Sequence, residues 1–165
     1  MGSQPQPSGG RNDLSVSGLS VRHIADEQWY EVKAQMHGDT RVSIWEKYLE
    51  WRPEFLALYA RYDPHMIVEA HGHMSDHIVF VLEGEILVGE ELCRAGAHLT
   101  LEKGASFGPI LAGPEGALLY EIMMGDPRAV PANHEQFAAL CAERGVTPLP
   151  NPPLEFPSWV GERLD

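Results

Sequence analysis

The stretch that decides the fold is EAHGHMSDHIVFVLEGE, residues 69–85. It places three histidines, His71, His73 and His77, within seven consecutive positions. Imidazole is the commonest metal ligand among protein side chains at physiological pH. His71 and His73 stand two residues apart, so on a β-strand they point to the same face, and a tight turn through residues 74–76 would return His77 beside them. The stretch therefore predicts a metal site built from three imidazoles.

The sequence on both sides of this stretch has the pattern of short β-strands separated by turns. Residues 41–51 alternate between two faces, one of which carries Val42, Ile44, Glu46 and Tyr48. Further strand-like segments cover residues 55–62, 66–73, 77–91, 97–110 and 116–124. Within residues 77–91, the pair Glu83-Gly84 predicts a hairpin turn. Roughly seven or eight such strands predict an all-β sandwich or barrel.

Both ends of the chain differ from this β-rich middle. Residues 1–18 are rich in Gly, Ser, Gln and Pro, which predicts a disordered tail. A barrel domain is expected over residues 19–130, and it begins with a short N-terminal segment whose structure the sequence leaves open. Residues 131–165 are expected to form a helix followed by a proline-rich arm.

The C-terminal helix is predicted over residues 134–144. Asn133 is a suitable N-cap, Gln136 follows it as in a capping box, and Gly145 stands where a helix ends. Prolines then recur from Pro148 onward and exclude regular structure. The arm also carries large apolar residues, so we expect it to pack on the barrel or on a second subunit.

Composition narrows the range of partners. The 165-residue chain has a formal net charge of -12 at pH 7, which disfavours binding to nucleic acid or to anionic lipid. No apolar stretch is long enough to span a bilayer, and the N-terminus lacks the apolar core of a secretory signal. Cys93 and Cys141 are the only cysteines, and we expect each to be a small buried side chain in a reducing cytoplasm.

The histidine stretch resembles the first motif of the cupin superfamily, G-x5-H-x-H-x3/4-E-x6-G. His71 and His73 match its paired histidines, and Gly84 matches its closing glycine. The resemblance covers residues 40–125. It implies a double-stranded β-helix, the jelly-roll barrel of cupins, with a metal bound inside.

The chain departs from the cupin motifs at two positions that matter for the metal. His77 replaces the glutamate of the first motif. The second motif, G-x5-P-x-G-x2-H-x3-N, maps onto Gly96, Gly104, Phe107 and Leu111, so its metal-binding histidine becomes Phe107. The resemblance therefore implies that the metal ligands are three histidines of the first motif and that the second motif supplies none.

Three neutral imidazoles leave the charge of a divalent metal uncompensated, so such a site favours an anionic ligand. Iron suits it best by analogy with three-histidine cupins, and Zn, Ni, Cu or Mn are alternatives. With iron, the resemblance implies a mononuclear non-heme dioxygenase acting on a small organic acid, diketone or thiol.

Several further residues are candidates for the site. His98 and Glu121 are possible fourth ligands. An apolar pocket with a few polar groups suits a small organic substrate. Its predicted lining comprises Phe107, Leu111, Val79, Tyr59 and Arg61.

Two other functions remain open from the sequence. One is a non-catalytic cupin that binds or senses a metal or a small ligand. The other is a metal-dependent isomerase or lyase, which needs no oxygen. In each case a homodimer is expected, because cupins often pair through their sheets.

Overall fold

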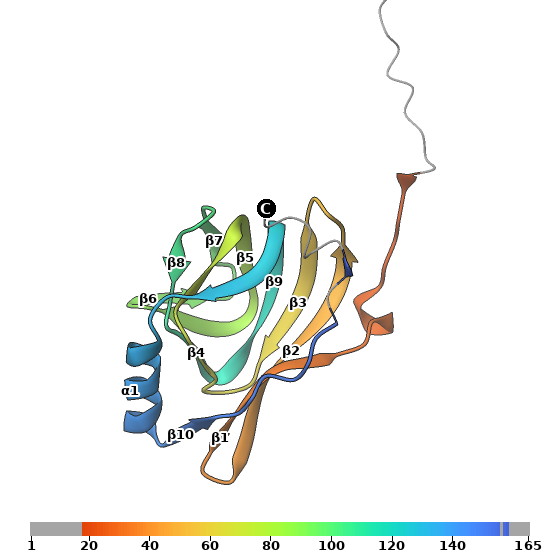
Figure 1. Cartoon of the computed structure of the whole chain (residues 1–165). Coiled ribbons are helices and arrows are strands. Elements are labelled where there is room, and N and C mark those ends of the chain that lie inside the picture. The colour runs from red at the N-terminus through yellow and green to blue at the C-terminus, as the bar shows by residue number, and fades with distance from the viewer. Residues whose placement is uncertain (1–17, 156, 159–165) are drawn as a thin grey trace, which may run out of the picture.

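The computed structural model describes residues 18–155, 157 and 158, most of which lie in β-strands (Figure 1). The predicted N-terminal tail therefore lies outside the described residues except for Gly18. In chain order the elements are the 3-10 helix η2 (Ile24–Asp26), β1 (Tyr30–His37), β2 (Thr40–Trp51), β3 (Leu56–Tyr62), β4 (Ile67–Val68), β5 (His71–Val88), β6 (Glu91–Arg94), β7 (His98–Leu101), β8 (Ser106–Phe107), β9 (Ile110–Pro131), α1 (His134–Arg144) and β10 (Val146–Pro148).

The strands form one antiparallel sheet that curls around a central core. Its order is β10-β1-β2-β3-β9-β5-β6, with β4 paired to β9 and both β7 and β8 paired to β5. The long strands β5 and β9 pair along most of their length and bend together (Figure 1). This arrangement confirms the predicted all-β jelly-roll barrel.

Strand β5 corrects two predictions made for the histidine stretch. It runs without a break from His71 to Val88, so neither the turn at residues 74–76 nor the hairpin at Glu83-Gly84 exists. Register shifts against β9 occur there instead, and Gly84 has a φ of 69°. A Cβ at Gly84 would lie 2.1 Å from the carbonyl oxygen of Gly116, so glycine permits a close backbone approach within a bent strand.

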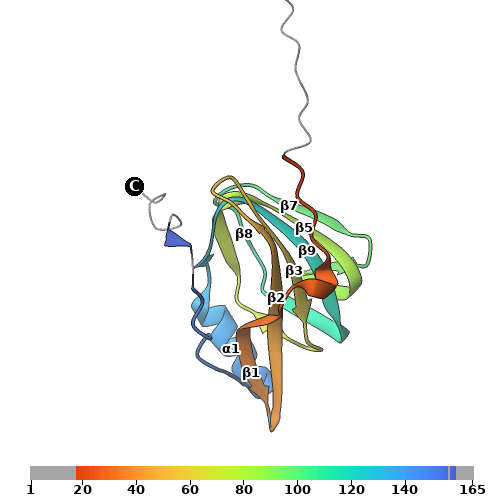
Figure 2. The same cartoon turned by 90° about the vertical axis from the view of Figure 1, so that its right-hand side faces the viewer.

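Apolar side chains fill the barrel and also cover one part of its outer surface. The main core takes residues from β1, β2, β3, β5 and β9. A smaller cluster lies outside the barrel, where Cys141 of α1 and Val146 of β10 pack on Ile67. Both cysteines are buried and free, as predicted. Figure 1 shows α1 and β10 side by side at one edge of the molecule, and Figure 2 shows α1 next to β1.

The C-terminal helix begins and ends where the sequence predicts. The Asn133 side chain accepts a hydrogen bond from the Gln136 backbone N–H at 3.0 Å, and Gly145 terminates the helix in the left-handed region with a φ of 65°. The arm that follows β10 packs on the barrel through Leu154. Residues 156 and 159–165 of the predicted arm lie outside the described residues.

No helix within residues 18–155, 157 and 158 is long and apolar enough to cross a membrane. The expected homodimer, like the expected absence of nucleic-acid partners, stays a prediction.

Candidate metal and substrate site

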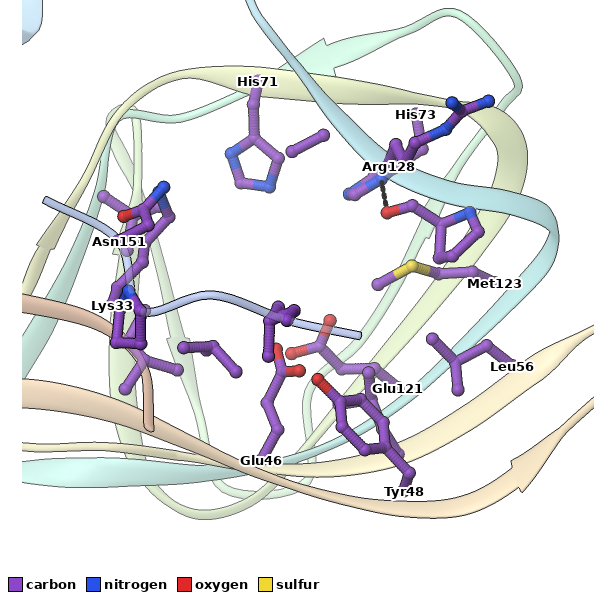
Figure 3. Close-up of a pocket in the computed structure, with 18 of the residues that line it drawn as sticks. Lys33, Glu46, Tyr48, Leu56, His71, His73, Glu121, Met123, Arg128 and Asn151 are labelled. Atoms are coloured by element: carbon purple, nitrogen blue, oxygen red, sulfur yellow. Dashed lines mark hydrogen bonds between the residues drawn. The ribbon is translucent and has the colours of Figure 1, made fainter. Parts of the chain in front are cut away.

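A cavity of about 440 Å³ opens inside the barrel between the histidine stretch and the strands opposite (Figure 3). Its volume is in the range typical of small-molecule sites. His71 and His73 form one wall, and Glu46, Tyr48 and Glu121 lie across from them. Side chains such as Leu56 and Met123 give the cavity an apolar side, and the C-terminal arm reaches it with Asn151, Pro152 and Leu154.

The three histidines lie together because they share one face of a bent strand. The ring centroids of His71 and His73 are 5.2 Å apart, and those of His73 and His77 are 4.9 Å apart. Four residues of straight strand would span about 13 Å. A register shift between His73 and Ser75 accompanies the bend in β5. The three rings therefore lie close together as the sequence predicts, but strand curvature brings them together rather than a turn.

Each imidazole has one nitrogen engaged by a hydrogen-bond acceptor. His71 Nδ1 lies 2.8 Å from the carbonyl oxygen of Glu69, and His73 Nδ1 lies 2.9 Å from that of Pro127. His77 Nε2 lies 2.9 Å from Glu121 Oε2. A carbonyl or an ionised carboxylate can only accept, so in the neutral rings these nitrogens carry the proton. The other nitrogen of each ring then carries a lone pair.

Two of these lone pairs are buried without a partner. His73 Nε2 and His77 Nδ1 are enclosed and have no hydrogen-bond partner among the described residues. A buried unsatisfied nitrogen is unfavourable unless a ligand completes it. An imidazole held at one nitrogen by a carbonyl or carboxylate, with the other nitrogen bare, is the usual state of a metal-binding histidine. In chemical type the donor set therefore fits a transition metal.

The donors are not directed at one point, however. Among residues 18–155, 157 and 158, no three His, Cys, Asp or Glu side chains are grouped so that they could hold one ion. His77 instead forms a buried pair with Glu121, in which the side chains are 2% and 8% exposed. The ligation predicted for His71, His73 and His77 stays a prediction.

Burial keeps the histidine wall neutral. It lowers the pKa of His71, and burial together with the neighbouring His77 and His71 lowers the pKa of His73 to about 4. Neutral imidazoles at neutral pH are available both as metal ligands and as hydrogen-bond acceptors.

The opposite wall carries a carboxyl group that titrates near neutrality. Burial, and then the negative charge of Glu121, raises the pKa of Glu46 to about 7. The Tyr48 hydroxyl donates a hydrogen bond to Glu46, and burial raises the pKa of this tyrosine well above its ordinary value. Glu46 can therefore hold or release a proton inside the cavity at physiological pH.

Of the two predicted fourth ligands, only Glu121 lies in the site. His98 is exposed on β7, where its Nε2 lies 3.1 Å from Thr100 Oγ1, so that prediction is wrong. Strand alternation explains the difference, because His98 pairs with Phe80 on the far side of β5 from the cavity.

Phe107 faces inward, as expected for the residue that replaces the motif histidine. Its ring centroid lies 4.8 Å from that of His71 and 5.8 Å from that of His77. It packs on the histidines and on the core but does not line the cavity. Val79 is likewise a core residue, only 3% exposed, rather than a pocket residue.

The other three predicted pocket residues lie outside the cavity. Leu111 packs in the outer cluster beneath α1, because the chain changes direction at Gly108, where φ is 110°, and inverts the face expected from Phe107. Tyr59 and Arg61 occupy the outer face of β3. The Arg61 guanidinium there lies over the rings of Trp29 and Trp45. Tyr62, on the other face of β3, lines the cavity instead.

Glu46, Tyr48 and Lys33 line the cavity although they were not predicted as site residues from the sequence. A signal existed for the first two, because they continue the face of β2 that begins with Val42 and Ile44. A carboxylate in phase with buried apolar residues points toward the interior. No such signal exists for Lys33, because a β-bulge changes its direction.

Comparison with solved structures shows which fold this is. The chain is similar to an RmlC-like cupin from Shewanella frigidimarina, at 18% identity over 70% of this chain and 93% of that one, with a TM-score of 0.52. It is similar to the polyketide cyclase RemF from Streptomyces resistomycificus, at 15% identity over 76% and 93% of the two chains, with a TM-score of 0.58. A proposed acetylacetone dioxygenase from Methylibium petroleiphilum is 14% identical over 74% and 88%, with a TM-score of 0.55.

The comparisons made on sequence find no counterpart: no protein-family model matches this chain, and no curated protein does. At these identities the structural likeness establishes the fold alone.

Proposed function

Since this chain has the cupin fold, we propose that it is a metal-dependent enzyme whose barrel holds one divalent transition metal and a small organic substrate. His71, His73 and His77 would hold the metal, and Glu121 would fix the ring of His77 through its other nitrogen. Iron is the metal we propose first, and a dioxygenase acting on a small organic acid, diketone or thiol is the activity.

One observation carries this proposal: each of the three histidines has one nitrogen fixed by an acceptor and the other left bare. For His73 and His77 the bare nitrogen is buried and finds no partner within residues 18–155, 157 and 158. Such an arrangement is unfavourable in an empty core, and a cation that accepts these lone pairs would relieve it. The wall that carries them opens onto the cavity through His71 and His73.

A divalent metal at this wall would act as a Lewis acid toward a substrate oxygen or sulfur, and iron(II) would in addition activate dioxygen. The side chains of the chain itself have separate tasks. Leu56 and Met123 exclude water from the apolar side of the cavity. The carbonyls of Glu69 and Pro127 keep the rings of His71 and His73 in one tautomer.

The first test is metal binding. The full chain, stripped of metal, is titrated with Fe(II), Zn(II) and Ni(II) under anaerobic conditions, and bound metal is measured by calorimetry and elemental analysis. We expect one ion per chain, and a loss of affinity of at least tenfold in His73→Ala. His98→Ala is the matched control, because His98 is exposed and remote from the cavity. Equal binding by both variants would refute the proposed ligands.

The second test is oxygen uptake by the iron-loaded chain. A panel of small organic acids, β-diketones and thiols is offered, and diketones belong in it because of the similar structure from Methylibium petroleiphilum. Substrate-dependent oxygen consumption that His73→Ala abolishes is the expected result. Metal binding with no oxygen uptake on any substrate would exclude the dioxygenase.

Glu46 favours a second candidate, a metal-dependent isomerase or lyase. A partly buried carboxyl with a pKa of about 7 on the cavity wall has the properties of a general acid or base. It could take a proton from carbon in a substrate held between the two walls. Turnover of the same panel without oxygen, lost in Glu46→Gln, would select this candidate over the first.

A further inference from the structure

Lys33 reaches the cavity because of an irregularity in β1. The pairing of β1 with β2 shifts between Glu31 and Lys33, so that Glu31 faces Trp45 and Lys33 faces the adjacent Ile44. With regular alternation, Glu31 and Lys33 would share the outer face. The bulge at Val32 instead turns Lys33 inward beside Ile44, and both residues line the cavity. Bulges often re-aim a side chain at a functional site.

The Lys33 ammonium group lacks a direct partner in the part of the chain that the structure describes. Within residues 18–155, 157 and 158 it forms no hydrogen bond and no ion pair, although the carboxylates of Glu69 and Glu46 are near enough to favour its charged form. Burial lowers its pKa. A half-buried, unpaired cation is costly to place in a cavity, so its presence calls for an anion that arrives with the ligand.

A second polar group reaches the same side of the cavity. The C-terminal arm is tied to β1, because the Leu149 backbone N–H donates to the carbonyl oxygen of Ala34 at 3.0 Å. The arm continues beside β1 in the antiparallel direction of β10. This brings Asn151 to the part of β1 that carries Lys33. Figure 3 shows Lys33 and Asn151 on the same side of the cavity, away from Leu56 and Met123.

We propose that Lys33, aided by the Asn151 amide, binds the carboxylate of the substrate. The substrate class is then a short organic acid whose carboxylate meets Lys33 and whose reacting group faces the wall of His71 and His73. Apolar parts of the molecule would contact Leu56 and Met123. This inference deepens the proposed function, from which it takes a small organic molecule as the ligand, but it requires no metal.

The chemistry of the subsite selects a carboxylate over other small ligands. An ammonium group and an amide N–H can each donate to one oxygen of a carboxylate, and such charge-assisted bonds are stronger than neutral ones. A neutral amide of the same shape offers a single uncharged acceptor oxygen. The subsite should therefore distinguish an acid from its amide.

The test measures binding of acetate and benzoate, each against its neutral amide, to the full chain before and after metal loading. We expect the carboxylates to bind more tightly than the amides. Lys33→Met should weaken carboxylate binding about tenfold or more, and Lys33→Arg should retain most of it. Lys103→Met is the control, because it removes the same charge from an exposed turn outside the cavity.

The proposal is overturned if neither carboxylate binds more tightly than its amide, or if Lys33→Met binds carboxylates as well as the wild type does. Metal titration of the same variants keeps this result apart from the proposed function. The subsite is supported if Lys33→Met binds metal as the wild type does but no longer binds carboxylates more tightly than their amides. Carboxylate binding by a chain that takes up no metal would refute the metal proposal and leave the subsite standing.

Discussion

Replacing Glu46 by Gln should stabilise the protein at neutral and alkaline pH and leave it unchanged in acid. The folded state raises the pKa of Glu46 from 4.5 to about 7, so between these values the folded chain holds a proton that the unfolded chain has released. The stability that Glu46 contributes is therefore fully present below pH 4.5 and is lost as the pH rises toward 7. At about 1.4 kcal/mol per pKa unit, the full loss is about 3 kcal/mol. Because Glu46 is only partly buried, we expect about 1–3 kcal/mol.

The stability that His73 contributes depends on pH in the opposite direction. Its pKa falls from 6.5 to about 4 on folding, so between these values the unfolded chain binds the extra proton. Stability from His73 is present above pH 6.5 and is lost as the pH falls toward 4. In the wild type the two effects largely cancel between pH 4.5 and 6.5. In Glu46→Gln the effect of His73 remains, and that of His71 acts in the same direction, so stability should rise by at least about 2–3 kcal/mol from pH 4 to 6.5 and then stay level.

The assay is urea denaturation of the metal-free full chain at several pH values between 4 and about 8. Glu143→Gln serves as the control, because it makes the same change of charge at an exposed position on α1. The side-chain amide introduced by Glu46→Gln still accepts the Tyr48 hydrogen bond, so packing is preserved. If the stability profile of Glu46→Gln runs parallel to the wild type over the whole range, Glu46 is not protonated in the folded state and the reasoning fails.

Three further predictions concern packing and buried polar groups. Gly84→Ala should destabilise the protein by more than about 2 kcal/mol in urea denaturation, whereas Gly38→Ala, at a similar φ but with open space around it, should cost at most about 1 kcal/mol. If both variants lose the same stability, the close approach of Gly84 to Gly116 is refuted. Glu121→Ala should lower the free energy of unfolding by about 1–3 kcal/mol because His77 Nε2–H loses its acceptor, whereas Glu121→Gln retains one; if thermal denaturation finds both variants equally destabilised, the pair is not a hydrogen bond. Leu154→Asp should release the arm and cost about 1–2 kcal/mol, with Glu155→Gln as the neutral neighbour, and unchanged denaturation would mean that the arm does not stabilise the barrel.

The sequence predicted the fold well because its strongest signals are local. Alternation along β2 and the capping residues around α1 each act over a few positions, and the structure has both of them. The clustering of His71, His73 and His77 was also predictable. An even spacing puts these side chains on one face of a strand whatever the curvature of that strand.

Other residues could not be placed from the sequence, because a single bulge or change of chain direction can invert the face of the residues beyond it. Lys33 faces the cavity because of a bulge at Val32, and no residue type in the sequence predicts that bulge. Leu111 lies outside the cavity because the chain changes direction at Gly108, between β8 and β9. Arg61 was a candidate only while the inner face of β3 was unknown.

The two walls of the cavity are electrically coupled, and this coupling links the metal proposal to the behaviour of Glu46. Glu121 raises the pKa of Glu46 by its negative charge and is itself hydrogen-bonded to His77. A divalent cation held by the imidazoles would offset the charge of Glu121 and favour ionised carboxylates nearby. Metal binding should therefore lower the pKa of Glu46 and reduce the advantage of Glu46→Gln at alkaline pH. If that advantage is the same with saturating Zn(II) as without metal, the cation does not bind beside Glu121, and the ligand set of the proposed site must be different.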